Sequence, residues 1–473
     1  MKNTQNTFDL IVIGTGVSAS TVAWECHSAG WKIAVIDSRP FGGTCALRGC
    51  DPKKVLVGAA ELIDWIHRME SKGIGSKVTK DVIINWPELM QFKRTFTEPV
   101  PKNREEAFSK AGINSFHGTA RFVGPNTIKV IEDTNKSKEQ TIRGKYILIA
   151  TGARPAKLNI TGEQHVVTSD QFLELDRLPS DILFIGGGYI SFEFAHIAAR
   201  CGSNVTILHR SKRPLLGFDP DLVSLLLKRT REIGINVNLE SSVKKIEPID
   251  NGRKFAVYSS NAQGKTNDAK GTEVIETELI VHGAGRVPDT KDLNLDTAGI
   301  EFDTKGGVKV NEYLQSVSNA AVYGAGDVAA SEGIPLTPVA EYEGEIVAHN
   351  LLNGNKSRPN YIGIPSVVFT VPSLASVGLQ EEAAKQQGLN FRTTYKDTSS
   401  WYSSRRIGES CSGFKVLIEK SSNCILGAHI LGSHAEEAIN IFALAIRLGL
   451  NVDKIKEVIF TYPTNTYDIR YML

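Results

Sequence analysis

The stretch FDLIVIGTGVSA, residues 8–19, decides the fold of the N-terminal part of the chain. Its apolar start predicts a buried strand, and Gly14 and Gly16 follow directly. A helical stretch and a second apolar run, residues 32–36, then lead to Asp37. This order is a βαβ dinucleotide fingerprint, in which the glycines let the backbone approach a pyrophosphate at a helix N-terminus and the acid accepts from a ribose hydroxyl. The alternative is a glycine turn with no ligand.

The next informative stretch is GGTCALRGCDPKK, residues 42–54, which places Cys45 and Cys50 five positions apart. A regular helix rises about 1.5 Å per residue, so it holds such cysteines too far apart for an unstrained disulfide, whose Cα atoms lie about 4.4–6.8 Å apart. Gly49 is the expected hinge that distorts this turn. The two cysteines are therefore a candidate redox pair, and the alternative is two unrelated buried thiols.

The stretch DILFIGGGYIS, residues 181–191, repeats the order of strand, glycines and helix, and predicts a second nucleotide site. Its second strand, residues 204–208, ends on His209 and Arg210, with two further cations close behind and no acid. Cations bind a 2′-phosphate, whereas a carboxylate there would repel it. This favours NADPH over NADH, and the alternative is a solvated basic turn.

Length, charge and cysteine usage narrow the class of protein. The 473 residues exceed a single core and indicate about three domains. The 54 basic and 52 acidic residues nearly cancel without long runs of one sign, so we expect small-molecule partners, with no nucleic acid and no membrane. The start is polar, no apolar run reaches about eighteen residues, and the remaining cysteines lack zinc-ligand spacing. These features predict a cytoplasmic protein with no metal site.

Three later segments each combine an apolar strand with small residues: ILIATGARP (147–155), GAGRVPDT (283–290) and VYGAGDVA (322–329). The polar stretch 261–272 is expected to be a solvated loop. From Tyr361 onward apolar residues alternate, with a hairpin pattern from residue 413 and an amphipathic helix over 435–448.

Together these motifs resemble the flavin-dependent pyridine nucleotide-disulfide oxidoreductases, the family of glutathione reductase, dihydrolipoamide dehydrogenase and mercuric reductase. The resemblance covers almost the whole chain. It implies an α/β fold with two Rossmann-like domains, for FAD and NAD(P), plus an α+β C-terminal dimerisation domain, and therefore a homodimer. The implied domains are the first part of the FAD domain (1–152), the NAD(P) domain (153–282), the second part of the FAD domain (283–355) and the interface domain (356–473).

The resemblance also implies roles for individual residues. Cys45 would be the thiol that attacks a disulfide substrate, and Cys50 the thiolate lying against the flavin. A lysine, either Lys53 or Lys54, would pair with Glu193 near the flavin. The residues expected to bind FAD are Gly14, Gly16, Ala19, Asp37, Gly43, Thr44, Thr151, Gly152, Gly324 and Asp327. Those expected to bind NADP are Gly186, Gly188, Tyr189, Ile190, His209, Arg210, Gly285 and Arg286.

Three departures from the family pattern bear on the chemistry. Leu47 and Arg48 stand where the family commonly carries asparagine and a small apolar residue. Arg48 would stabilise a thiolate, whereas Asp51, beside Cys50 and in place of Val or Ile, would oppose it and disfavour an anionic substrate. The alternative is that either side chain points to water. The largest departure is Tyr462, at the place of the histidine base, with Tyr467 at the place of its glutamate. A tyrosine, with a pKa near 10, is a poor base at neutral pH. Mercuric reductases also carry tyrosine here but add a C-terminal cysteine pair, which this chain lacks. The alternative is that Tyr462 only packs the dimer interface.

The sequence thus predicts an enzyme that passes electrons from NADPH through FAD and the Cys45–Cys50 disulfide to a small disulfide such as glutathione disulfide. A soft metal ion or a quinone is the alternative acceptor, favoured by Tyr462. A further alternative is a redox sensor that keeps FAD and the cysteine pair without sustained turnover.

Overall fold

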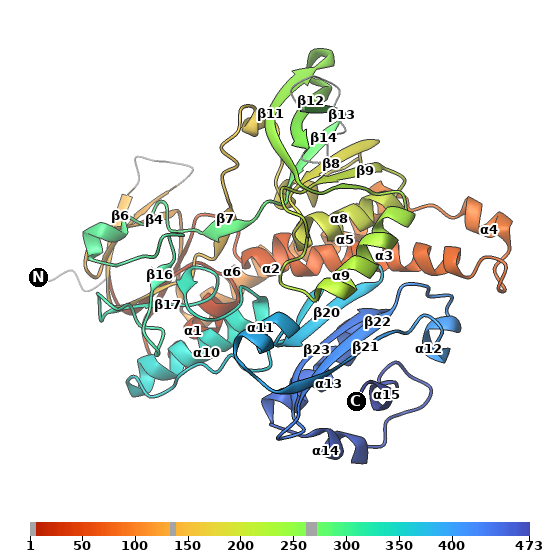
Figure 1. The fold of residues 1–473 in the computed structure, drawn as a ribbon. Coiled ribbons are helices and arrows are strands. Elements are labelled where there is room, and N and C mark those ends of the chain that lie inside the picture. Colours follow the sequence, from red (N-terminus) through yellow and green to blue (C-terminus); the bar gives the residue numbers. More distant parts are fainter. Residues whose placement is uncertain (1–5, 133–138, 262–271) are drawn as a thin grey trace, which may run out of the picture. The chain divides into compact units, whose positions relative to one another are not determined.

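The structure is a computed structural model that describes residues 6–132, 139–261 and 272–473 (Figure 1). The chain divides into two compact units. The first comprises Met1–Pro52, Lys93–Ala156 and Arg286–Tyr361, and the second comprises Lys53–Phe92, Lys157–Gly285 and Ile362–Leu473. The loop expected over residues 261–272 lies outside the described residues except for its two ends.

The first unit is built on a seven-stranded sheet whose central strands are parallel. Residues 10–13, 33–36, 147–149 and 322–324 of these strands are buried, as expected for strands covered on both faces. These strands are β3 (Asn114–His117), β2 (Ile33–Asp37), β1 (Thr7–Ile13), β6 (Glu139–Ile149) and β17 (Val322–Gly324). Two antiparallel strands, β5 (Thr127–Ile131) and β4 (Thr119–Gly124), extend the sheet beyond β6.

Helices α1 (Val17–Ser28) and α10 (Thr337–Asn353) lie side by side and share one apolar cluster with β1 and β2 (Figure 1). Helix α6 (Pro99–Ala111) adds to the same cluster through Phe108. Two segments that the sequence analysis singled out pair as a short antiparallel ribbon, β7 (Ala153–Pro155) with β15 (Arg286–Pro288). The predicted first strand is β1, which ends at Ile13, and α1 begins shortly afterwards at Val17.

The second unit holds a four-stranded parallel sheet, in the order β10 (Asn236–Asn238), β9 (Asn204–Leu208), β8 (Asp181–Ile185) and β14 (Leu279–His282). Helices α3 (Cys50–Arg68), α8 (Tyr189–Arg200) and α9 (Pro220–Glu232) contribute to one large apolar cluster with it. A separate antiparallel sheet comprises β11 (Ser241–Ile249), β12 (Lys254–Asn261) and β13 (Thr272–Thr277).

The C-terminal part of the second unit is a five-stranded antiparallel sheet packed against helix α13 (Ala435–Arg447). Its strands, in order, are β19 (Ser366–Val368), β20 (Ser373–Gly378), β23 (Ile425–Gly432), β22 (Gly413–Glu419) and β21 (Phe391–Asp397). The hairpin predicted from residue 413 is β22–β23, and the predicted helix ends one residue early. The predicted α/β fold, with two sheets that have parallel central strands and an α+β C-terminal part, is confirmed.

The remaining helices are α2 (Gly43–Arg48), α4 (Ser76–Asp81), α5 (Trp86–Thr97), α7 (Ser169–Phe172), α11 (Glu381–Gln386), α12 (Tyr402–Arg405), α14 (Val452–Glu457) and α15 (Ile469–Met472).

Candidate functional site

The glycine turn after β1 has the geometry of a phosphate-binding turn. Gly14 has φ +113°, and a Cβ there would lie 2.4 Å from the carbonyl oxygen of Ala150, so only glycine fits. Gly16 caps α1, and among the described residues no side chain caps that helix, so its first N–H groups suit an anion. At the end of β2, Asp37 accepts a hydrogen bond from Thr15 Oγ1 at 2.6 Å and keeps acceptor capacity for a ribose hydroxyl.

A second helix N-terminus meets this turn. A Cβ on Gly43, at the start of α2, would lie 2.4 Å from the Cα of Gly16, and the Gly42 N–H donates to Thr15 Oγ1 at 3.2 Å. Four of the predicted FAD residues, Gly14, Gly16, Gly43 and Thr44, are thereby brought together. The result is a cradle that side chains would fill, and it fits the diphosphate of FAD.

The loop after β17 carries Asp327, whose pKa is raised by burial. A buried acid on α10, Glu343, holds this loop: it accepts hydrogen bonds from the Gly326 N–H at 2.7 Å and from the hydroxyls of Ser331 and Tyr361. Glu343 was not predicted from the sequence, since α10 carries other acids and a second buried polar residue, Asn350. Two further predicted FAD residues, Ala19 and Gly324, are buried in α1 and at the end of β17.

The remaining residues predicted to bind FAD, Thr151 and Gly152, are held by hydrogen bonds beside the β7–β15 ribbon. Thr151 Oγ1 donates to the Asp289 carbonyl at 2.7 Å, and the Asp289 N–H donates to the Gly152 carbonyl at 2.9 Å. Arg286, expected to bind NADP, lies in this first unit, where its guanidinium donates to the carbonyl of Ala153.

Cys45 and Cys50 lie on opposite sides of a break between α2 and α3. Gly49 forms the break, and a Cβ there would lie 2.9 Å from the Thr44 carbonyl oxygen, which agrees with its predicted role as a hinge. Both cysteines are thiols in this structure and are hydrogen-bonded to each other. That hydrogen bond, and then burial, raise the pKa of Cys45 far above its usual range.

Two oxygen atoms contact the sulfurs. Thr337 Oγ1, from the first residue of α10, lies 3.4 Å from Cys50 Sγ, and Asp51 Oδ1 lies 3.8 Å from Cys45 Sγ. Asp51 was expected to act on Cys50, its neighbour in sequence, but the structure places its carboxylate at Cys45. The sequence analysis missed Thr337, which is separated from Cys50 by 287 positions and has no local motif.

The second glycine turn has the same geometry as the first. Gly186 has φ +113°, and a Cβ there would lie 2.2 Å from the carbonyl oxygen of Gly283. Gly188 caps α8, and no side chain of the described chain caps that helix either. Tyr189, the first residue of α8, is 48% exposed. The two other predicted residues here are Ile190, half-buried, and Gly285, with φ +106°.

The two basic residues after β9 have different surroundings. The His209 ring lies against Gly187, and its Nε2 lies 3.0 Å from the Arg213 carbonyl oxygen. Burial lowers the pKa of His209, which makes the ring a neutral packing and hydrogen-bonding group. Of these two residues, only Arg210 is exposed.

The lysine doublet after Cys50 is divided between two partners. Lys53 Nζ lies 2.8 Å from Glu193 Oε2 on α8, whereas Lys54 pairs with Glu61 at 3.3 Å on the surface of α3. Glu193 is 1% exposed and also accepts the Phe369 N–H at 2.8 Å. The alternative that the sequence left open is thus decided: Lys53 is the partner of Glu193.

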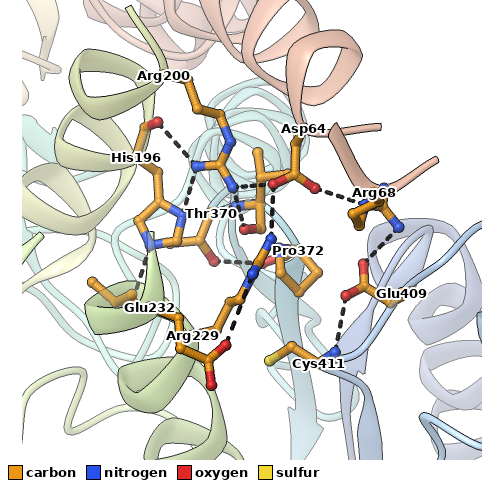
Figure 2. A network of polar contacts seen from close by, with 12 residues as sticks. Asp64, Arg68, His196, Arg200, Arg229, Glu232, Thr370, Pro372, Glu409 and Cys411 are labelled. Carbon is orange, nitrogen blue, oxygen red and sulfur yellow. Dashed lines mark hydrogen bonds and ion pairs between the residues drawn. The ribbon is translucent and has the colours of Figure 1, made fainter. Parts of the chain in front are cut away.

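A buried charge network fixes the helices that carry this pair (Figure 2). Asp64 on α3 accepts hydrogen bonds from Arg200 at 2.6 Å and from Arg229 at 3.2 Å, and it forms an ion pair with Arg68 at 2.7 Å. Arg68 also bonds Glu409 at 3.1 Å, before β22. Burial opposes ionisation of Asp64, but the arginines, led by Arg200, lower its pKa below the usual value. The network ties α3 and α8 together within the second unit.

The C-terminal tyrosines line a cavity of about 430 Å³. Tyr462 is 66% exposed, and its ring lies edge-on to that of Tyr467, with centroids 4.9 Å apart. Tyr467 forms a similar pair with Tyr471 at 6.0 Å. Trp401 and Tyr402, far away in sequence, complete the aromatic lining. The positions of the family's histidine and glutamate are thus occupied by two phenol rings in contact.

Comparison with known proteins identifies the relatives of this chain. The model of the pyridine nucleotide-disulphide oxidoreductase family matches residues 8–344. The model of the dimerisation domain of the same family matches residues 364–472. A mercuric reductase of Staphylococcus aureus is 31% identical, covering 98% of this chain and 81% of its own. A glutathione reductase of Burkholderia cepacia is 32% identical, covering 97% and 96%. The Cu(II) complex of the HOCl-induced flavoprotein disulfide reductase RclA from Escherichia coli has a TM-score of 0.86 and 25% identity, covering 99% of each chain.

None of the helices among the described residues combines the length and apolar composition needed to cross a bilayer. In the same residues, no three or more His, Cys, Asp or Glu side chains are grouped so that they could hold a metal ion.

Proposed function

Because this chain belongs to the pyridine nucleotide-disulphide oxidoreductase family, and is therefore a flavoprotein oxidoreductase with a nicotinamide partner, we propose that it passes electrons from NADPH to a small disulfide. The acceptor we propose is a molecule such as glutathione disulfide. The observation that carries this proposal is the pair of hydrogen-bonded thiols, Cys45 and Cys50, at a helix break where only glycine fits. The match to the dimerisation domain supports a homodimer as the working form.

The thiols would act in sequence. The Cys45 thiolate attacks one sulfur of the acceptor, which forms a mixed disulfide and releases one thiolate. Cys50 then attacks Cys45 Sγ, which releases the second thiolate and closes the Cys45–Cys50 disulfide; the two product thiolates take up two protons. FAD, when bound, supplies the transfer of two electrons from the nicotinamide back to this disulfide. The Thr337 hydroxyl, 3.4 Å from Cys50 Sγ, is placed to donate a hydrogen bond to a Cys50 thiolate.

NADPH is the proposed donor because Arg210 is exposed at the end of β9, where an acid would bind the 2′-hydroxyl of NADH. Lys53 is the proposed partner of the flavin, since Glu193 holds it as the cation of a buried pair. A cation of this kind stabilises negative charge that develops on a cofactor.

A soft metal ion is a second candidate acceptor. Tyr462 replaces the base that protonates a leaving thiolate in disulfide-reducing relatives, and a metal ion needs no such proton. One relative is a mercuric reductase, and a solved relative is a Cu(II) complex. These names support a metal ion as the second candidate acceptor.

The test is an acceptor screen that follows NADPH consumption by the FAD-loaded enzyme with glutathione disulfide, lipoamide, coenzyme A disulfide, Hg(II), Cu(II) and quinones. We expect sustained consumption with a disulfide, and its loss in Cys45→Ser. Turnover with quinones alone that survives Cys45→Ser would reject the dithiol route. No turnover with any acceptor would favour a redox sensor.

A further inference from the structure

The carboxylate of Asp51 is the charged group that the structure places on the attacking sulfur. Its Oδ1 lies 3.8 Å from Cys45 Sγ, and the side chain is exposed where an acceptor would approach. The family resemblance implies Val or Ile at this position. The negative charge beside the dithiol is therefore a departure of this chain, and the electron transfer proposed above makes no use of it.

The two lysines that follow Asp51 pair with other carboxylates. Lys53 is paired with Glu193, and Lys54 with Glu61. Asp51 also stands in the first turn of α3, where the helix dipole stabilises a negative charge. The carboxylate is therefore expected to act on the charge of whatever approaches Cys45.

We propose that Asp51 is a specificity-determining residue that makes this dithiol select acceptors by charge, with cationic acceptors preferred over neutral ones and anionic ones disfavoured. This inference rests on the proposed function, since it concerns the acceptor of the same thiol. It orders disulfides as well as metals: a dicationic disulfide such as cystamine ranks above neutral lipoamide, and lipoamide above anionic glutathione disulfide. A metal cation shares the advantage of cystamine.

The size of the effect follows from Coulomb's law. A reagent that carries one unit charge about 6 Å from the Asp51 carboxylate in water should react with Cys45 about threefold faster or slower, according to the sign of its charge. A cationic and an anionic reagent should therefore differ by roughly tenfold because of this side chain alone. The difference should fall as salt is added, since the Debye length shrinks from about 10 Å at 0.1 M to about 3 Å at 1 M.

The decisive experiment needs no turnover. In the FAD-loaded Cys50→Ser protein, Cys45 is treated with two methanethiosulfonates that differ in charge, the trimethylammonium-ethyl and the sulfonato-ethyl reagent. With either reagent, the Cys45 thiolate displaces methanesulfinate and forms a mixed disulfide. Mass spectrometry then assigns the added group to Cys45. Both reagents attack the same thiolate, so a change in the pKa of Cys45 cancels in the ratio of their rate constants.

We expect the ratio of cationic to anionic rate constants to fall roughly tenfold in Asp51→Asn and to be retained in Asp51→Glu, which keeps the charge. An equal ratio in Asp51→Asn and its parent would overturn the proposal, as would a ratio that is insensitive to salt. Steady-state turnover of cystamine, lipoamide and glutathione disulfide then provides the second arm. If the labelling ratio shifts but no acceptor is turned over, the charge selection stands and the proposed function fails.

Discussion

Replacement of Lys53 by methionine tests the pairing of the lysine doublet, because Lys54 is a matched control. Both ammonium groups lie near the ring of Phe369, at 4.9 and 4.6 Å from its centroid, so this contact is lost equally in either variant. They differ in their carboxylate partners. Glu193 is 1% exposed and its lysine 13%, whereas Glu61 and its lysine are 41% and 44% exposed.

The two substitutions should therefore differ in their effect on the free energy of unfolding. Removing one partner of a buried ion pair costs about 3–5 kcal/mol, because the other charge stays buried without compensation. Glu193 retains the hydrogen bond from the Phe369 N–H, so we place Lys53→Met near the lower end, at about 3 kcal/mol. An exposed pair contributes about 0.2–1 kcal/mol, and solvent screening places Lys54→Met near the bottom of that range.

The assay is urea unfolding of the FAD-loaded protein at fixed protein and FAD concentrations, since bound cofactor and dimerisation both shift the midpoint. We compare the midpoints at equal slope, first for the two single variants and then for Lys53→Met combined with Glu193→Gln. The double variant should recover most of the loss, because the amide keeps an acceptor for Phe369 without a buried charge. A loss in Lys54→Met equal to that in Lys53→Met, or no recovery in the double variant, would refute the pairing.

Three further predictions concern the relay, the donor and acid stability. Anaerobic reduction of the wild type should consume two electrons per subunit beyond the capacity of the flavin. A Cys50 thiolate against the oxidised flavin should give a long-wavelength charge-transfer band, which Cys50→Ser should remove and Cys45→Ser should make permanent. Arg210→Glu should reverse the preference for NADPH, with a change of about one to two decades in the ratio of kcat/KM values, and equal use of both nucleotides by the wild type would contradict this. Because the folded-state pKa of Asp64 is lowered, its stabilisation is present above the unfolded value, near 3.9, and is lost as pH falls through the folded value. The difference in urea midpoint between wild type and Asp64→Asn should therefore shrink on acidification below about pH 4.

Much of the fold could be predicted because its signals are local. A glycine turn such as that at Gly14 requires a positive φ and a close backbone approach, and the sequence carries this requirement within a few residues of the strand that it ends. Gly49 is a similar case, since the helix break between Cys45 and Cys50 follows from one residue without a side chain. The alternation of apolar residues near residue 413 likewise predicted the β22–β23 hairpin.

The site was less predictable wherever a partner comes from a distant segment. Thr337 contacts the dithiol and Glu343 holds the loop of Asp327, but both belong to α10, whose sequence carries no local motif for either contact. Lys53 and Lys54 are adjacent, so the residue pattern could not say which one meets Glu193; that choice depends on the rotation of α3 against α8. Contacts of this kind are fixed by tertiary packing rather than by local sequence.

The buried face of α8 shows how such packing determines the position of a functional side chain. Glu193, His196 and Arg200 are three and four residues apart, so they lie along one face of the helix. Each bonds the same short segment: Glu193 accepts the Phe369 N–H, His196 Nδ1 accepts the Val371 N–H at 3.1 Å, and Arg200 donates to the Val371 carbonyl at 2.9 Å. Burial lowers the pKa of His196, which keeps the ring neutral and able to accept. Glu193 is therefore held by the helix and by this segment at once, and the buried charge that remains on it requires the cation at Lys53.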